Sequence, residues 1–562
     1  MNIYALVKAI LSTIALVFIS DGYISAASIF PFLIAALLYF FYLPAENEHS
    51  LWTKIAGLVF AFLASLSLFQ VNVFDSLLGE LSLFVMLVKL LVFAAGIYYL
   101  SVAILVRIYR WLDNYHLDTK LTIGKTKIFI ISFITLLVLY LPVWLMEYPS
   151  NISPDTLSQI WQILNGQYVN HHPFAHTLWL KLLMSFADEL NLRIAIAAAI
   201  QMVINAAVFS YVIAFVADKT KSLYLTIFSW AFYGLLSFNA FFSITLIKDV
   251  THATITCLMV VLLYKSYSDK RLIDYGLFGL ITVGFCLFRS NGYYACFLVL
   301  AVSLAIGWWQ HSYRVSLIIL GALILSALIK GPLYHVLGVS DPSIVEMLSI
   351  PLQQIAFVIR NGGKIGPEEY AMLNQVVDVS RIPEAYDFFL SDPVKNLVNE
   401  FANLSYLKAN ALNYFKLWLK IGIDNPILYI RAWVNQISLL FSPHYYATSI
   451  FWTVHPNDLG IVGQPLLIEG TINEQLHMLA YQQHKIPLIG WFHYQSFTTW
   501  IMLGCAFYSL RRKDPSAIVI FSIFIGILIT LCLSSPYNLC FRYYYAVVAC
   551  LPLMLFLTFR KI

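Results

Sequence analysis

The chain has 562 residues, of which 60% are hydrophobic and only 11% are charged, with a formal net charge of +5. A soluble globular protein carries about 25% charged residues, so this composition excludes a chain that covers itself with polar surface in water. It predicts an integral membrane protein whose apolar side chains face lipid.

Apolar stretches follow one another along the whole sequence. A transmembrane helix needs about 20 consecutive, mostly apolar residues. Fourteen stretches come close to that length and predict an all-α membrane protein: 3–20, 27–44, 55–73, 82–106, 127–147, 194–217, 222–240, 250–266, 272–288, 293–310, 315–332, 487–510, 515–533 and 543–559.

The basic residues fall on one side of these predicted spans. With the N-terminus in the cytoplasm, the loops 21–26, 74–81 and 148–174 lie outside and contain no Lys or Arg, whereas 107–127 contains five. Cytoplasmic loops of membrane proteins carry an excess of basic residues. The sequence therefore predicts a multi-pass protein of the cytoplasmic membrane with both termini inside.

Long polar stretches divide the chain into four regions. The region 333–486 is rich in Pro, Asn, Asp and Gln, and two of its segments, 343–360 and 407–420, have one apolar face at helical spacing. We therefore expect a small, mainly helical extracytoplasmic domain there. The complete division is a four-span region 1–126, a membrane core 127–332 with the first outer loop 148–193, the outer domain 333–486 and a three-span region 487–562.

Seven cysteines are present, and six of them lie within apolar runs. Only Cys540 lies near an outer loop, and no metal-ligand spacing occurs among them. We expect neither structural disulfides nor a zinc site. A divalent cation as cofactor stays an open alternative.

The first outer loop contains a short helix, 154–164, whose two ends the sequence predicts. Ser153 suits the N-cap, Pro154 the first helical position and Gly166 the position past the end. Apolar residues recur at i, i+3, i+4 and i+7, which predicts a helix lying flat on the membrane. Asp155 belongs to the opposite, polar face, where it would be held over the protein.

Asp155 has two interpretations at this point. A carboxylate in the first helical turn interacts favourably with the helix dipole, by about 0.3–1 kcal/mol, and needs no further purpose. The alternative is a catalytic carboxylate. His171 and His172, just before Pro173, are either a polar turn or part of a site, and the pair alone is a weak indication of a metal.

Three basic residues stand at the predicted outer ends of spans. Lys248, Arg289 and Arg542 are each isolated there. One such residue is most simply a side chain that reaches out of the lipid to water. Three at the same depth favour an anion site, where a lipid phosphate would place its charge. Asp249 is a second catalytic candidate, with an ion pair to a basic neighbour as the alternative.

A series of short motifs connects these features. Ser153-Pro154-Asp155 is followed by Gln159 and by the segment Asn165 to Pro173. Lys248-Asp249, Phe288 to Gly292, Pro351 to Gln354 and Phe541-Arg542-Tyr543 then follow in order. In this order they resemble bacterial GT-C type glycosyltransferases, polytopic enzymes that use polyprenyl-phosphate sugars, and one large bacterial family of that type in particular.

The resemblance implies a GT-C-like fold and names roles for residues. It implies Asp155 as the catalytic base, while Lys248, Arg289 and Arg542 would bind the donor phosphate. The remaining motif residues are candidates for the substrate pocket: Gln159, His171, His172, Asn291, Gln353, Gln354 and Tyr543. The resemblance does not cover the first four predicted spans.

The expected function is therefore transfer of a sugar from a polyprenyl-phosphate donor to a glycan or lipid acceptor of the cell envelope, with inversion. The expected partners are that donor, that acceptor and membrane lipid, without nucleic acid. A transporter or flippase for lipid-linked saccharides is the main alternative, and a saccharide polymerase or ligase is another. Transporters tend to show internal repeats, spans broken by Gly or Pro and polar groups at the midplane, whereas this sequence has a membrane interior poor in charge and polar clusters at the outer ends of the spans, which favours the enzyme.

Overall fold

The computed structural model describes residues 2–20, 28–43, 50–79, 81–115, 121–401, 403–442, 454–467 and 470–560. Regular structure in these ranges is helical, and β-type contacts are limited to isolated bridges. The predicted all-α class is therefore confirmed for the described part of the chain.

Among the described residues, eight helices are long and apolar enough to cross a membrane. They are Leu83–Asn114 (α5), Lys125–Met146 (α6), Leu190–Thr220 (α9), Lys248–Ser268 (α12), Ser290–Gln310 (α14), Arg314–Val336 (α15, Arg314–Leu328; η2, Ile329–Leu333; α16, Tyr334–Val336), Pro515–Ser534 (α26) and Phe541–Phe559 (η8, α27 and α28). Several apolar helices of this length define a multi-pass membrane protein.

The count of fourteen spans stays a prediction. The number in the described residues rises to ten if each of two bent pairs is one span: α3 (Leu51–Ser67) with α4 (Val71–Leu77), bent by 86°, and α10 (Leu223–Leu235) with α11 (Ser237–Ile244), bent by 56°. The other predicted spans coincide with helices of 17 residues or fewer: α1 (Ile3–Ile19), α2 (Phe30–Tyr42), α13 (Leu272–Phe288) and α25 (Gln495–Arg511).

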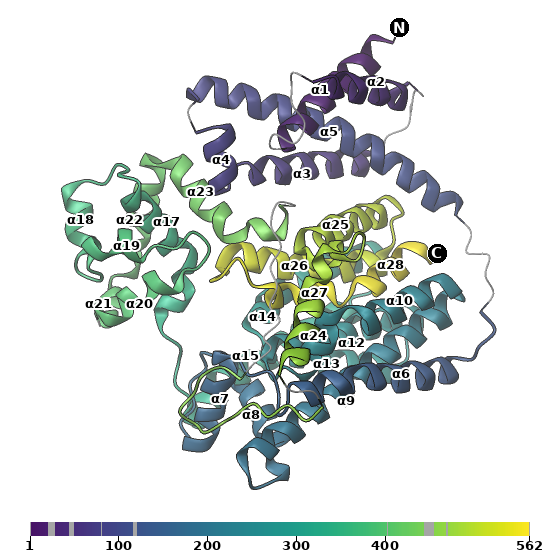
Figure 1. Cartoon of the computed structure of the whole chain (residues 1–562), viewed down its shortest axis with the longest axis vertical. Helices are drawn as coiled ribbons and strands as arrows, with labels where there is room; N and C mark the ends of the chain where they lie inside the picture. Colours follow the sequence, from purple (N-terminus) through teal and green to yellow (C-terminus); the bar gives the residue numbers. More distant parts are fainter. Residues whose placement is uncertain are drawn as a thin grey trace.

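Burial separates the central helices from the peripheral ones. We compare the most apolar stretch of each span. In Phe541–Phe559, 89% of the residues of that stretch are buried, whereas the share is 22% in α5 and 22% in α6. The last segment, comprising η8 (Phe541–Tyr544), α27 (Tyr545–Val548) and α28 (Leu551–Phe559), therefore lies at the centre, packed against α9 and α12. In Figure 1 α12 and α27 lie in the middle of the molecule, and α1–α5 form a group at the top in which α3 packs against α25.

The short helices of the loop 148–193 lie at one end of the central bundle. They are α7 (Pro154–Asn165) and α8 (Phe174–Leu183). Ser153 caps α7 by accepting a hydrogen bond from the Thr156 amide, and Gly166 ends it with φ of 67°. The predicted ends of this helix are thus confirmed, because both depend on local chemistry.

The polar face of α7 is partly buried, as expected for a face held over the protein. Gln159 and Gln162 are buried, whereas Trp161 and Leu164 are 45% and 44% exposed. Gln162 is satisfied by the Val169 amide, which donates to its side-chain oxygen. Apolar residues of α7 are therefore available to lipid, while part of its polar face is used inside the protein.

A layer of short helices with its own hydrophobic core projects beyond the bundle, at the left of Figure 1. Its elements are η3 (Ile344–Leu348), α17 (Ser349–Arg360), α18 (Pro367–Leu373), η4 (Val379–Arg381), α19 (Ile382–Ala385), α20 (Asp392–Glu400), α21 (Leu404–Ala409), α22 (Ala411–Asp424) and α23 (Pro426–Ile437). The Asn170 amide donates to the Ser340 carbonyl, which joins the loop 148–193 to the segment that leads into the layer.

The remaining elements follow this layer in the sequence. They are η5 (Ser438–Leu440), α24 (Thr471–Tyr481), η6 (Gln482–Lys485) and η7 (Gly490–His493), and η1 (Met184–Phe186) follows α8. Residues 454–466 run beside the start of the loop 148–193, where the His455 amide donates to the Ile152 carbonyl and the Gln464 amide to the Tyr148 carbonyl.

Candidate active site

The site is built where α12 begins beside α7. The Thr156 hydroxyl donates to the Leu246 carbonyl, and the Ser150 hydroxyl donates to the Ile244 carbonyl. Gln201 of α9 donates to the Thr245 carbonyl in the same break between α11 and α12. These buried hydrogen bonds satisfy backbone groups that no helix uses and hold the first turn of α12 against α7.

Asp155 and Lys248 meet as a result of this arrangement. The Lys248 ammonium lies 2.8 Å from Oδ2 of Asp155 and 3.0 Å from Nδ1 of His172. An ammonium group can only donate, so Nδ1 of His172 accepts and the neutral ring carries its proton on Nε2. Burial, followed by the charge of Lys248, lowers the pKa of His172 well below its ordinary value, which keeps this ring neutral.

Arg542 supplies a second cation to the same carboxylate. Its Nη2 lies 3.3 Å from Oδ2 of Asp155, and its Nε donates to the Cys540 sulfur. The turn η8 that carries Arg542 is fixed by Phe541, whose ring packs against Phe238 of α11. Two residues far apart in the sequence therefore converge on one oxygen atom.

The two cations determine the charge state of Asp155. Burial alone would raise the pKa of this carboxyl, but the charges of Lys248 and Arg542 hold the pKa well below its ordinary value. Asp155 is therefore a carboxylate throughout the physiological pH range. Its side chain keeps 22% of its surface exposed, so it is accessible to a ligand.

A second ion pair lies beside the first. Arg289, just before α14, is paired with Asp249 of α12, and both side chains are buried. The Tyr543 ring lies between the two guanidinium groups, 5.2 Å from that of Arg289 and 5.4 Å from that of Arg542. Such contacts are attractive because the face of the ring is negative.

Three cations and two carboxylates thus share one small volume. We call Asp155, Lys248, Asp249, Arg289 and Arg542 the charged cluster. With His172 neutral, the charged cluster has one positive charge in excess. A group with this excess favours an anionic ligand, and guanidinium groups suit the oxygens of a phosphate.

The predicted pocket residues lie at various places around this cluster. The His171 ring is 4.5 Å from that of His172. Gln159 is buried below the site, where it donates to the Thr177 hydroxyl and bonds Nδ1 of His176. Asn291 is half-buried in the first turn of α14, two residues after Arg289.

Gln353 and Gln354 have partners within the outer helical layer. Gln353 donates to the carbonyls of Asp387 and Leu390, and Gln354 accepts a hydrogen bond from the Trp418 indole. These contacts hold α17 to its neighbours. They assign the two amides to the structure of the layer rather than to the charged cluster.

Three further polar side chains near the site were not predicted from the sequence. His176 is buried in the first turn of α8, four residues after His172, and burial lowers its pKa to about 3. Glu147 and His477 form a 2.5 Å contact at the edge of a polar cavity of about 630 Å³, which Tyr148 and Asn473 also line. No local pattern relates residues so far apart.

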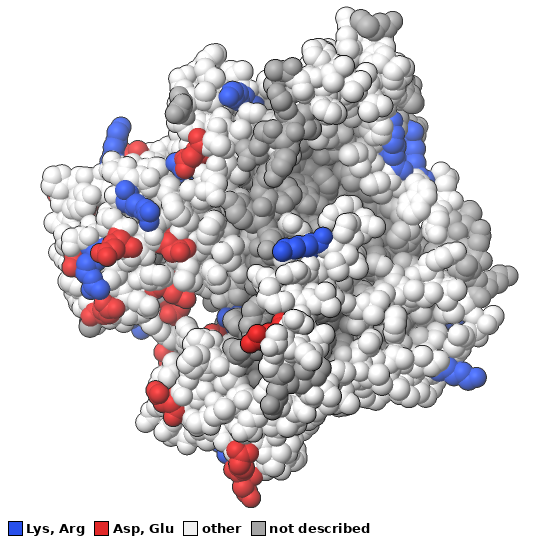
Figure 2. Space-filling model, in the orientation of Figure 1, with Lys and Arg blue, Asp and Glu red and all other residues white. Residues whose placement is uncertain are grey.

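Surface charge agrees with a bundle surrounded by lipid. Figure 2 shows acidic and basic side chains gathered over the layer α17–α23, while the broad face over α6 and α10 is nearly free of charge. The basic side chains on that face lie at its right edge, where α6 begins in Figure 1. Within the described residues, no group of three or more His, Cys, Asp and Glu side chains is placed to hold a metal ion.

The helices and the site together define a multi-pass membrane protein with a charged cluster at one end of its bundle. Residues 159–562 match the model of a family of unknown function, DUF6020, and the chain belongs to that family. The match includes Lys248, Asp249, Arg289 and Arg542, whereas Asp155 lies four residues before it. Comparisons with curated proteins and with solved structures give no match.

Proposed function

We propose that this protein is a GT-C type glycosyltransferase. It would move a sugar from a polyprenyl-phosphate donor to a glycan or lipid acceptor of the cell envelope, on the outer side of the cytoplasmic membrane. The observation that carries the proposal is the single accessible carboxylate, Asp155, shared between Lys248 and Arg542 at the ends of spans.

The cations would bind the phosphate of the donor. Lys248 and Arg542 already contact an anionic oxygen, so a phosphate oxygen can take the place of the carboxylate with little rearrangement. Arg289 is neutralised by Asp249, so it would act mainly by positioning Tyr543 and by adding to the local field. This arrangement stabilises negative charge where it increases during departure of the phosphate.

Asp155 would then act as the base. In the free protein its pKa is too low for efficient proton abstraction, because two cations stabilise the carboxylate. A bound phosphate would draw Lys248 and Arg542 toward itself and so raise the pKa of Asp155. The base is thereby activated only when the donor is present.

The reaction is a single displacement. The acceptor oxygen attacks the anomeric carbon as its proton passes to Asp155, and the bond between that carbon and the phosphate oxygen breaks. The electron pair leaves with the polyprenyl phosphate, and the anomeric configuration is inverted. The polar cavity beside Tyr148, seven residues before Asp155 in the chain, is the proposed place of the acceptor.

The decisive experiment uses the purified protein in vesicles with a panel of polyprenyl-phosphate sugars and candidate acceptors. We expect one donor to be consumed, with a glycosylated product of inverted configuration detected by mass spectrometry and NMR. Movement of an intact lipid-linked saccharide across the vesicle membrane, without any transfer of sugar, would contradict the proposal and support a transporter.

A further inference from the structure

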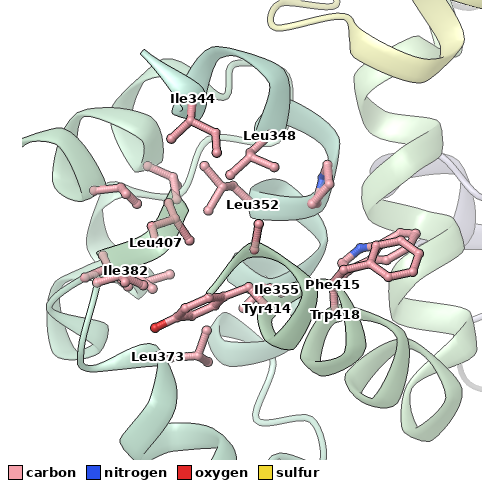
Figure 3. Close-up of a pocket in the computed structure, with 16 residues that line it drawn as sticks. Ile344, Leu348, Leu352, Ile355, Leu373, Ile382, Leu407, Tyr414, Phe415 and Trp418 are labelled. Carbon is pink, nitrogen blue, oxygen red and sulfur yellow. The ribbon is translucent and has the colours of Figure 1, made fainter. Parts of the chain in front are cut away.

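The outer helical layer encloses an apolar cavity of about 270 Å³. Figure 3 shows its walls: Ile344 and Leu348 from η3 on one side, and Leu373 with Tyr414 of α22 opposite them. Sixteen residues line it, and their side chains are aliphatic or aromatic. An apolar cavity of this kind stays dry and binds apolar ligands.

The few polar atoms of the lining are turned to other partners. The Tyr414 hydroxyl donates to the Met372 carbonyl, and the Trp418 indole donates to Gln354. A ligand inside the cavity would therefore meet hydrocarbon alone. This excludes a sugar or another polyhydroxyl compound, whose groups would lose their hydrogen bonds to water without replacement.

One wall of the cavity is close to the charged cluster. Glu346 belongs to η3 between Ile344 and Leu348, and it pairs with Lys395 at 2.8 Å. Glu346 and Lys395 both lie near enough to His171 to act on its pKa. His171 contacts His172, which contacts Lys248. The Asn170 amide, next to His171 in the chain, donates to the Ser340 carbonyl, four residues before Ile344. The loop that carries the two histidines is thereby joined to the segment that leads into the cavity wall.

The helix at the other side of the cavity presents apolar residues outward. Leu412, Phe415 and Leu419 of α22 are between 42% and 66% exposed, and Phe415 also lines the cavity. Lys416 lies on the same helix and is exposed as well. An exposed apolar row with lysines beside it is typical of a helix at a membrane surface, from which a lipid chain can enter.

We propose that this cavity binds part of the hydrocarbon chain of the lipid phosphate whose head group the charged cluster would hold. The inference rests on the proposed function. An apolar cavity of about 150 Å³ binds a molecule as large as benzene, so about 270 Å³ accommodates roughly ten carbon atoms. Only part of a long chain would lie there, with the rest in the bilayer.

Photolabelling tests the proposal directly. The purified protein is placed in phosphatidylcholine vesicles with farnesyl phosphate that carries a diazirine at the end of its chain, and labelled residues are located by mass spectrometry. We expect labels on cavity residues. Ala411→Trp fills the cavity at its exposed edge and should reduce labelling about tenfold or more, since each excluded methylene weakens binding about fourfold.

Matched variants make the result specific. Leu412→Trp lies beside Ala411 but outside the lining and should label like the wild type. Val377→Phe fills the cavity from another wall and should act like Ala411→Trp. Arg542→Ala should also reduce labelling, because it removes a group that holds the head of the same molecule.

The proposal would be overturned if no cavity residue were labelled. It would also be overturned if Ala411→Trp and Val377→Phe both left the labelling of the cavity unchanged. Equal labelling in Arg542→Ala would also overturn it, as would labelling only by phosphatidylglycerol with a diazirine-bearing acyl chain. Asp155→Asn should keep the labels whatever its turnover. A wild-type protein that is labelled but transfers no sugar would therefore refute the proposed function and not the binding of the chain.

Discussion

At the scale of single residues, the distinctive feature is one oxygen atom of Asp155 shared by Lys248 and Arg542. A carboxylate that only stabilised the start of α7 would need neither cation. Two cations gathered on one accessible carboxylate instead resemble a binding site occupied by an internal anion. An anionic ligand could therefore compete with Asp155 for these two cations.

Asp155→Asn separates these roles. The amide keeps the size of the side chain but removes the charge and the basicity. We expect normal expression and turnover reduced about 100-fold or more, as for loss of a general base. Turnover is measured on purified protein with a defined polyprenyl-phosphate sugar. Asp155→Glu should restore little, because the reacting atoms must meet closely. Near-normal turnover of Asp155→Asn would remove it from the mechanism and make Asp249 the leading candidate.

Arg542→Lys tests the second cation. Lysine keeps the charge but cannot reproduce the planar fork of the guanidinium, so we expect weaker donor binding and much lower turnover. Arg542→Ala should lose more. Donor affinity and turnover are both measured, with Arg381→Lys in an exposed ion pair of the outer layer as the control. If both Arg542 variants kept full activity, Arg542 would only be an interfacial anchor.

At the scale of elements, the turn between α13 and α14 positions Arg289. Gly292 lies in the first turn of α14, where an added Cβ would lie 2.9 Å from Cε1 of His252 and closer still to the Phe285 carbonyl. No side chain fits there without moving one of the two helices. The glycine therefore permits the close approach that brings Arg289 beside Asp249.

Gly292→Ala should consequently destabilise the protein. Overpacking typically costs about 1–3 kcal/mol, and we expect a lower Tm together with weaker donor binding. The matched control is Gly276→Ala in α13, where no atom lies within 4 Å of the added Cβ. Thermal unfolding in detergent measures both variants. Equal Tm values for the two would show that the turn adapts easily and does not fix Arg289.

Local chemistry explains which elements could be predicted. The ends of α7 follow from Ser153, Pro154 and Gly166, and these were predicted correctly. The polar face was predicted to lie over the protein, but the partners of Gln159 on that face could not be predicted, because His176 and Thr177 belong to a neighbouring helix. Gln353 and Gln354 show the same limit, since their partners come from distant parts of the layer. A helix pattern identifies a polar face but not what will cover it.

At the scale of the whole molecule, the charged ends of the spans gather at one end of the bundle. The sequence predicted this gathering for Lys248, Arg289 and Arg542, because the positions of helix ends follow from span length and charge. It could not predict the pairing of Arg289 with Asp249 or of Arg542 with Asp155. Those pairs depend on the relative rotation and depth of four helices.

The orientation of the bundle is open to a direct test. Ser158 is exposed on α7, and Ser268 is exposed at the opposite end of α12. The native cysteines are buried or half-buried, so background labelling of these residues by the maleimide should be low. A membrane-impermeant maleimide should label Ser158→Cys in cells whose outer envelope is open, and Ser268→Cys only after lysis. The reverse pattern would place Asp155 in the cytoplasm and exclude the proposed donor side.

The charged cluster draws on distant parts of the chain, and this has a consequence for biogenesis. Ribosomes and the insertion machinery deliver Asp155 and Lys248 to the membrane long before Arg542. During that interval Asp155 has one cationic partner, whereas it has two in the finished protein, and the central segment η8–α28 is still missing. The protein should therefore stay inert toward lipid phosphates until its most buried segment inserts. Synthesis itself thus sets the moment at which activity begins.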